Sequence, residues 1–113
     1  MKKIEAIIRP EKMDGVREAL EETGYPGITV TEISGHGKQK GTFQKWRGEN
    51  YKIEFLPKVK VEVICLDDDL DKILKAIMES ASTGAVGDGK IFIYDVADVL
   101  RIRTGEKGRK ALL

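Results

Sequence analysis

Hydrophobic and polar positions divide the first third of the chain into segments with two different periods. Residues 2–9 alternate with period two and are rich in isoleucine, which predicts a strand. Residues 11–22 place apolar side chains at helical spacing, with Gly24 where a C-terminal cap is expected. Residues 28–33 are β-branched and alternate again, so they predict a second strand.

The same two periods return after a long interruption. Residues 58–66 alternate strictly, with valines on one face, and predict a third strand. Three aspartates at 67–69 provide a helix N-cap, and residues 70–81 then repeat apolar side chains on one helical face. Residues 90–96 predict a fourth strand, and residues 99–103 a short extended segment.

The order of these elements, βαββαβ, predicts the ferredoxin-like split βαβ fold, an α+β class with both helices on one face of an antiparallel sheet. Residues 1–113 form a single domain in this interpretation. Between strands two and three, residues 34–57 show no usable period, and loops of this length are usually functional. The sheet face without helices presents Ile7, Glu62 and Ile64, so we expect self-association to cover it.

Composition narrows the class of protein. The chain has 41% hydrophobic and 35% charged residues, a balance that argues against disorder, and no apolar run approaches the roughly 18 residues of a membrane span. The N-terminus lacks the apolar segment of a secretory signal. The single cysteine, Cys65, fits a buried position in a reducing compartment. These observations predict a cytoplasmic protein without membrane insertion.

Charge is strongly segregated although the net charge is only +1. Residues 36–60 carry seven positive and two negative side chains, which gives +5, and residues 101–110 carry five positive and one negative, which gives +4. The other 78 residues therefore total −8. Two compact basic segments in an acidic body suit a small polyanion better than a long nucleic acid.

A glycine-rich segment at residues 83–90 matches the spacing G-x-x-x-x-G-K of a phosphate-binding P-loop. The next residue is Ile91 where magnesium would need Ser or Thr, and the order is helix, loop, strand, so a P-loop is rejected. Anion binding remains the favoured interpretation of this segment. Gly84, Gly87 and Gly89 let backbone amides approach an anion closely and turn through positive φ, and Lys90 supplies a positive charge.

Two further basic clusters are candidates for the same ligand. Residues 35–41 combine glycines with lysines, a pattern equally typical of the start of a flexible loop. Arg101 and Arg103 lie on the same side of the predicted extended segment, where they could grip separate phosphate oxygens or belong to a solvated tail.

The long segment 38–57 carries Phe43, Trp46, Tyr51 and Phe55 among lysines. Aromatic side chains with an arginine are typical of protein interfaces, whereas disordered insertions are usually poor in aromatics. We therefore expect this segment to contact a protein partner.

Catalytic residues are not evident. The single histidine, His36, has no cysteine to activate and no second histidine for a metal. A small phosphate-ester hydrolase would need a base or nucleophile that the sequence does not supply. A ferredoxin-like nucleic-acid-binding module would need aromatics on the third strand, and residues 58–66 contain none. The residues themselves therefore favour neither an enzyme nor a nucleic-acid-binding module.

Taken together, these segments resemble the PII nitrogen-regulatory signal-transduction proteins, the GlnB/GlnK family. The resemblance covers essentially the whole chain and is carried by residues 2–10, 29–32, 35–41, 47–48, 55–62, 83–92 and 101–106. It implies a cytoplasmic homotrimer that senses ATP against ADP in the clefts between subunits and that binds 2-oxoglutarate together with ATP and Mg²⁺.

The resemblance also implies individual roles. The expected ATP and ADP contacts are Ile7, Thr29, Gly35, Gly37, Lys38, Glu62, Ile64, Gly87, Asp88, Gly89, Lys90, Arg101 and Arg103. The expected 2-oxoglutarate contacts are Gln39, Lys40, Gly41 and Lys58, with the Gln39 amide oxygen also on the magnesium ion.

Residues 37–57 resemble the T-loop of that family, 83–90 its glycine-rich loop and 101–113 its C-terminal segment. The resemblance implies that the T-loop controls target proteins such as an ammonium transporter, at which the protein would be peripheral to the membrane. Arg47 corresponds to a transporter-contacting arginine and Tyr51 to a tyrosine that some relatives modify. Glu49 replaces a serine that other relatives phosphorylate, and Trp46 replaces a common tyrosine.

Overall fold

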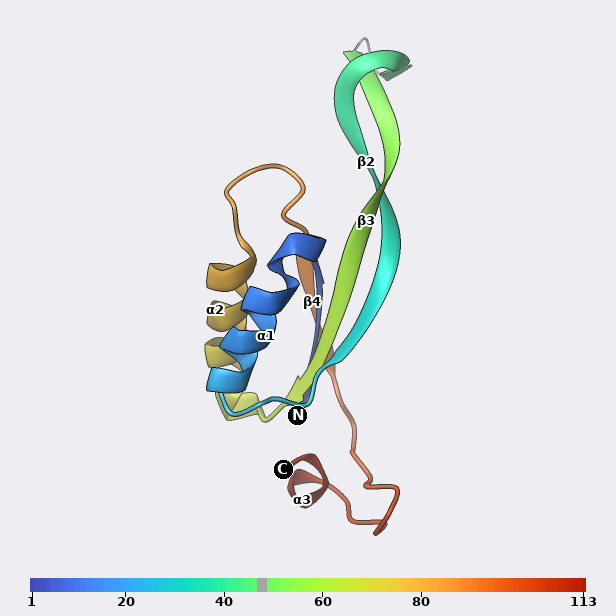
Figure 1. Cartoon of the computed structure of the whole chain (residues 1–113). Coiled ribbons are helices and arrows are strands. Elements are labelled where there is room, and N and C mark those ends of the chain that lie inside the picture. Colours follow the sequence, from blue (N-terminus) through green and yellow to red (C-terminus); the bar gives the residue numbers. More distant parts are fainter. Residues whose placement is uncertain (47–48) are drawn as a thin grey trace.

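The structure is a computed structural model that describes the backbone of residues 1–46 and 49–113 and the side chains of residues 1–34 and 56–113. Figure 1 shows the elements, whose bounds in chain order are β1 (Lys2–Ile8), the 3-10 helix η1 (Pro10–Lys12), α1 (Met13–Glu22), β2 (Thr29–Trp46), β3 (Glu49–Cys65), the 3-10 helix η2 (Asp67–Asp69), α2 (Leu70–Ala81), β4 (Lys90–Asp95) and α3 (Arg109–Leu112).

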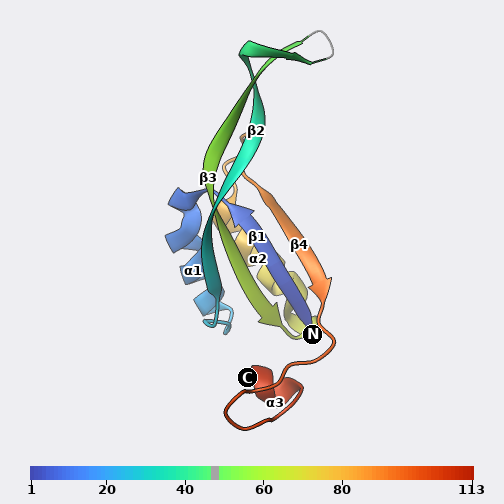
Figure 2. The same cartoon turned by 90° about the vertical axis from the view of Figure 1, so that its right-hand side faces the viewer.

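The strands form one antiparallel sheet in the order β2-β3-β1-β4. Helices α1 and α2 cover the same face of this sheet, and no helix of the described residues lies on the opposite face (Figures 1 and 2). This is the ferredoxin-like arrangement that the sequence predicts. In the part of the chain that the structure describes, no helix is both long and apolar enough to cross a membrane.

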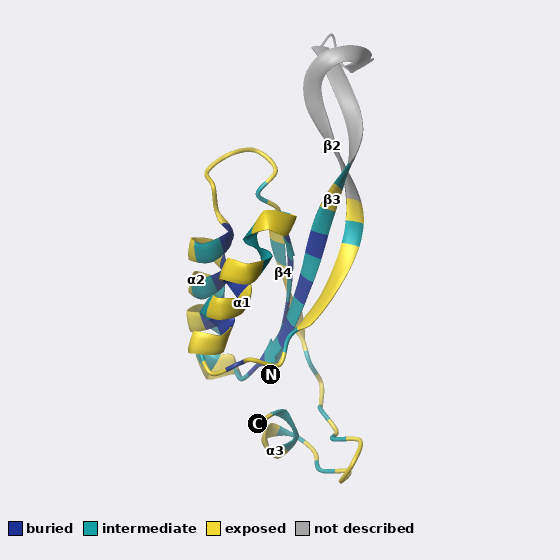
Figure 3. Ribbon diagram, in the orientation of Figure 1, coloured by how far each residue is buried: buried dark blue, intermediate teal, exposed yellow. Residues whose placement is uncertain are grey.

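The core lies between the helices and the covered face of the sheet, as the buried positions in Figure 3 show. The alternation predicted for β1 and β3 places every second side chain there, and α1 and α2 contribute one apolar stripe each. The buried residues are Ile4, Ala6, Ile8, Val16, Leu20, Tyr25, Val59, Val61, Val63, Cys65, Ile73, Ile77 and Ala81. Cys65 is fully buried, as predicted, and burial raises the pKa of its thiol.

The hairpin formed by β2 and β3 is longer than the sequence predicts. Pairing continues from Thr29 opposite Glu62 as far as Trp46 opposite Glu49, with one irregularity between Lys40 and Gln44. The hairpin therefore projects beyond the body of the molecule (Figure 1), and the longest dimension is 56 Å. In the outer hairpin only two strands pair, so neither face has to be apolar. The backbone hydrogen bonds form there, but no alternation of hydrophobic and polar residues in the sequence reveals them.

The aspartates at 67–69 do not provide the predicted side-chain cap. They form η2, and the residue that precedes α2, Asp69, makes no capping hydrogen bond with its side chain. Asp67 instead lies 2.9 Å from the amino group of Met1, and Asp69 accepts a hydrogen bond from the Tyr25 hydroxyl. Tertiary partners have replaced the local cap, and the hydrogen bond to each carboxylate lowers its pKa.

The extended segment predicted at 99–103 is also corrected. Only Leu100 makes a β-bridge, with Lys107, and residues 102–104 form a turn. Gly105 and Gly108 adopt positive φ angles of 73° and 69°, which lets the chain reverse before α3. Arg101 and Arg103 are therefore not two positions of one straight strand.

Candidate functional site

The glycine-rich loop connects α2 to β4 at the end of the sheet from which the hairpin projects (Figures 1 and 2). We call this the hairpin end. Gly84, Gly87 and Gly89 have φ angles of 82°, 100° and 101°. The prediction that these glycines turn the chain through positive φ is confirmed.

Gly89 is also required by a close approach of two backbones. A Cβ placed on Gly89 would overlap the carbonyl oxygen of Ile7 and lie 2.8 Å from its carbonyl carbon. Only glycine lets the chain enter β4 this close to β1. The position of Lys90, the first residue of β4, therefore depends on a glycine before it.

The Asp88 carboxylate organises the loop from inside. It accepts hydrogen bonds from the amides of Thr83 and Gly84, at 2.8 and 2.9 Å, and from the Thr83 hydroxyl. These donors, the Thr83 hydroxyl above all, lower the pKa of Asp88 far below its ordinary value. The carboxylate is therefore fully ionised at neutral pH.

Two cations reach the loop from outside. Arg9, just after β1, donates its Nε to Asp88 at 3.1 Å and its Nη2 to the carbonyl oxygen of Val86 at 2.9 Å. Lys58, on β3, donates its Nζ to the carbonyl oxygen of Gly87 at 2.6 Å. Sequence analysis missed Arg9, because nothing local distinguishes an arginine at a strand end from a solvated one.

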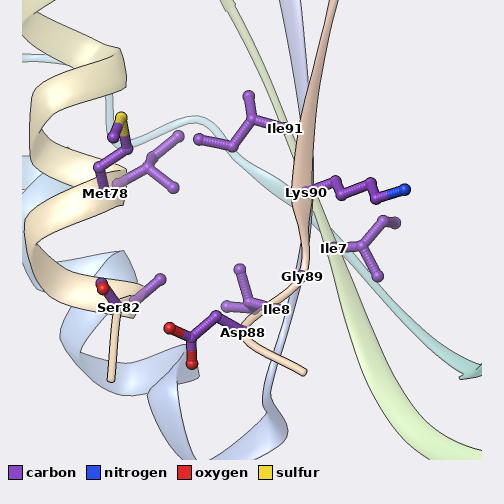
Figure 4. Close-up of a pocket in the computed structure, with 10 residues that line it drawn as sticks. Ile7, Ile8, Met78, Ser82, Asp88, Gly89, Lys90 and Ile91 are labelled. Atoms are coloured by element: carbon purple, nitrogen blue, oxygen red, sulfur yellow. The ribbon is translucent and has the colours of Figure 1, made fainter. Parts of the chain in front are cut away.

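A cavity of about 340 Å³ lies between α2 and the sheet next to the loop. Figure 4 shows that Met78, Ile91 and Ile8 point toward it, whereas the side chains of Ile7 and Lys90 project to the other side of the sheet. The cavity is therefore mainly apolar, and the Lys90 ammonium group belongs to the sheet face without helices.

A second cavity, of about 450 Å³, lies at the base of the hairpin. It is lined by Pro10 after β1, by Glu32 and Ser34 on β2, and by Pro57 and Lys58 on β3. Lys58 thus lies between this cavity and the glycine-rich loop, whose carbonyl oxygen it contacts.

The sheet face without helices carries a compact network of paired charges. Lys3 lies 2.8 Å from Glu62, and Lys60 lies 3.6 Å from both Glu5 and Glu62. The Tyr94 hydroxyl donates to Glu5 at 2.9 Å. The hydrogen bond from Lys3 lowers the pKa of Glu62.

Strand register spreads the predicted site residues along the sheet, from the hairpin end to the opposite end, which we call the far end. Because Ile7 is opposite both Lys60 and Lys90, it lies toward the hairpin end, and Glu62 and Ile64 lie progressively farther from it. The hairpin-end group contains Ile7, Lys58, Gly87, Asp88, Gly89 and Lys90. Thr29 and Glu62 lie midway along the sheet, opposite Glu5 of β1, and Ile64 lies opposite Lys3 near the far end. Arg101 and Arg103 follow β4 beyond that far end.

The segment that follows β4, to which the two arginines belong, lies at the opposite end of the body from the glycine-rich loop (Figure 1). The six residues of β4 separate the two regions by about 20 Å. Arg101 is 3.1 Å from Glu106 and donates to the carbonyl oxygen of Lys110 at 2.9 Å, while Arg103 is exposed. One copy of the chain does not bring the loop and the arginines together.

The predictions for Gly35, Gly37, Lys38, Gln39, Lys40, Gly41, Arg47 and Tyr51 concern side chains or residues outside those that the structure describes. Within the described residues, no three His, Cys, Asp or Glu side chains are grouped so that they could hold a metal ion.

Fold and site define a ferredoxin-like α+β protein whose polar groups gather around a glycine-rich loop and along one open sheet face. Comparison with known proteins makes this specific. The family described as "Nitrogen regulatory protein P-II" matches residues 1–106. The chain belongs to this family, and its role lies in nitrogen signal transduction.

Similar proteins extend the match over almost the whole chain. The nitrogen regulatory protein P-II of Pasteurella multocida (strain Pm70) is 55% identical over 112 residues, which cover 99% of this chain and 100% of the relative. The protein of the same name from Rhizobium meliloti (strain 1021) is also 55% identical, and "Nitrogen regulatory protein P-II 1" of Escherichia coli (strain K12) is 54% identical, both with the same coverage. These names describe regulatory proteins.

Proposed function

We propose that three copies of this chain form a homotrimer that binds ATP or ADP in each cleft between neighbouring copies. The triphosphate, with Mg²⁺ and 2-oxoglutarate, would set the conformation of residues 37–57, through which the protein would control targets such as an ammonium transporter. The protein would act in the cytoplasm and at the membrane surface when bound to such a target.

The observation that carries this proposal is the separation of the glycine-rich loop and Lys90, at the hairpin end, from Arg101 and Arg103, which follow β4 at the far end. A phosphate chain cannot contact Lys90 and Arg101 of the same copy, because about 20 Å of β4 separates their ends of the molecule. A second copy that presents its far end to the hairpin end of the first supplies both groups to one ligand.

The local chemistry of the hairpin end suits the phosphates. The amides of Thr83 and Gly84 are already bonded to Asp88, and that of Ala85 to the Thr83 hydroxyl, so an anion would use the amides that follow. Positive φ at Gly87 and Gly89 favours such an approach. Lys90 adds an ammonium group on the same face as Ile7 (Figure 4).

The part of this face from its middle to its far end suits the nucleoside. The Glu62 carboxylate, held by Lys3, offers acceptors for ribose hydroxyl groups, and Ile64 offers apolar surface for the base. Arg101 and Arg103 would add positive charge beside the phosphates of a ligand that the neighbouring copy holds.

The keto-acid would bind at the base of the hairpin. Lys58 borders the 450 Å³ cavity there. Its ammonium group carries three N–H donors, and the Gly87 carbonyl oxygen accepts from only one of them. It could therefore keep the Gly87 carbonyl oxygen and still pair with a carboxylate. Mg²⁺ would bridge phosphate oxygens, the keto-acid and the Gln39 amide oxygen, and would fix their relative orientation.

Mixing two defective variants tests the divided site. Lys90→Ala removes a group of the hairpin end, and Arg101→Ala removes a group of the far end, so each pure variant should bind ATP weakly. In trimers formed from equal amounts of both chains, about one quarter of the clefts combine two intact ends. Isothermal titration calorimetry should therefore recover about a quarter of the original high-affinity sites.

Two outcomes would overturn the proposal. Mixed preparations that recover no sites would place the complete site within one chain. An unmodified protein that sediments as a monomer and still binds ATP with full affinity would show that no second copy is needed.

A further inference from the structure

Arg9 holds the glycine-rich loop by a forked contact that spans its second half. The guanidinium group donates through Nε to the Asp88 carboxylate at 3.1 Å and through Nη2 to the Val86 carbonyl oxygen at 2.9 Å. It also packs on Gly87, where an added Cβ would lie 3.3 Å from Nη2. Arg9 and Asp88 side chains are each only 24% exposed, so the pair is partly shielded from solvent.

This contact joins two separate parts of the molecule. Asp88 ties the start of the loop to its end through Thr83 and Gly84, and Arg9 ties that unit to the end of β1. The residues between these anchors are Ala85, Val86 and Gly87, of which Val86 is almost fully exposed. Without Arg9, the Asp88 unit keeps its internal bonds but loses its link to the end of β1, while Lys58 of β3 still donates to the Gly87 carbonyl oxygen.

The side chains face in different directions. Figure 4 shows the Asp88 carboxylate on the α2 side of the chain and the Lys90 side chain on the other. A ligand beside Lys90 would therefore meet backbone of the loop and not the carboxylate.

We propose that Arg9 is a positioning residue for the phosphate-binding loop: its forked contact with Asp88 and Val86 fixes the amides and Lys90 in the geometry that a triphosphate needs. This inference rests on the proposed nucleotide site. Arg9 acts through the loop and contacts no phosphate itself. A lysine at position 9 would keep the charge but could not reproduce the planar fork.

Asp88→Asn separates positioning from simple electrostatics, because the two predict opposite signs. Removing a negative charge near an anion site should strengthen ATP binding if charge alone matters. If Asp88 matters as the anchor for Arg9, the same substitution should weaken ATP binding by about tenfold, the size expected for the loss of a charge-assisted hydrogen bond. Arg9→Lys should weaken it similarly.

The assay is ATP affinity by calorimetry, with adenosine affinity measured by competition against a fluorescent ATP analogue. Arg17→Lys is the matched control, because Arg17 lies on α1 and pairs only with Asp14 and Glu21 among the described residues. We expect Asp88→Asn and Arg9→Lys to weaken ATP, to leave adenosine unchanged and to melt near the unmodified protein, while the control binds ATP normally.

The unfavourable outcomes are distinguishable. Unchanged or tighter ATP binding by Asp88→Asn, or full affinity in Arg9→Lys, overturns the positioning role alone. Equal losses for ATP and adenosine mean that the contact supports the fold in general, and they also overturn it. No ATP binding by the unmodified protein overturns the proposed function, and the present inference falls with it.

Discussion

Replacement of Gly89 by alanine tests whether a backbone contact fixes the start of β4. The added Cβ would overlap the Ile7 carbonyl oxygen and lie 2.8 Å from the carbonyl carbon. Both atoms belong to the backbone of β1, so they cannot move aside as the end of a flexible side chain could. The neighbouring pair Ile7 and Lys90 must separate before the methyl group fits.

Two contributions set the expected cost. A left-handed backbone conformation costs an alanine about 1–2 kcal/mol. The loss of one or two backbone hydrogen bonds beside the overlap adds roughly 0.5–1.5 kcal/mol each. The sum is about 1.5–5 kcal/mol, which corresponds to a decrease in Tm of roughly 6–20 °C for a chain of this length.

Gly84→Ala is the matched control. Gly84 also has a positive φ angle, 82°, but a Cβ there meets no atom within 4 Å. It should therefore lower Tm by only about 4–8 °C. Thermal unfolding followed by circular dichroism, at one protein concentration and without nucleotide, measures both variants. A Gly89→Ala protein that melts within about 3 °C of Gly84→Ala would refute the steric argument.

Three further predictions concern stability. Tyr25→Phe should lower the free energy of unfolding by about 1–3 kcal/mol in urea titrations, because the Leu66 amide loses its hydroxyl acceptor; an unchanged midpoint would contradict this. Ile73→Ala should lower it by about 2–5 kcal/mol, since Ile73 is fully buried in α2, and a loss below about 1 kcal/mol would show a core that can collapse. Lys3 holds the pKa of Glu62 below its ordinary 4.5, so this pair stabilises the fold above pH 4.5 and loses its effect as the pH falls further. Glu62→Gln should therefore flatten the decrease of the free energy of unfolding at acid pH. An identical pH profile of the variant and the unmodified protein would contradict the pair.

The sequence predicts the fold best where one face of an element must be buried. Valines at every second position of β3, and apolar residues at helical spacing in α2, leave a pattern because the core accepts only one register. The same reasoning does not extend to the outer hairpin, because only β2 and β3 pair there and a two-stranded ladder does not need an apolar face. It fails again at Asp67, whose partner is the chain's own amino group rather than a helix end.

For the candidate site, composition and spacing reveal the glycines and the basic clusters but not their arrangement. Asp88 contacts Arg9 across 79 residues of sequence, and no local signal specifies such a pair. The separation of Lys90 from Arg101 likewise depends on the direction of β4, which becomes meaningful only once the sheet order is known. Motifs therefore indicate the candidate ligand chemistry, whereas topology decides which of the candidate residues one chain brings together.

The charge network on the sheet face without helices affects whether a second copy of the chain could cover this face. Lys3 and Lys60 are matched there by Glu5 and Glu62 within the same chain, and Tyr94 uses the remaining acceptor of Glu5. A neighbouring copy that covered this face would bury charges that already have partners within one chain. The neighbouring copy would therefore not need to supply opposite charges of its own. Burial of unpaired charges would oppose such an interface. Pairing within one chain therefore removes the main electrostatic obstacle to assembly, and Phe92, which is 44% exposed, supplies apolar area on the same face.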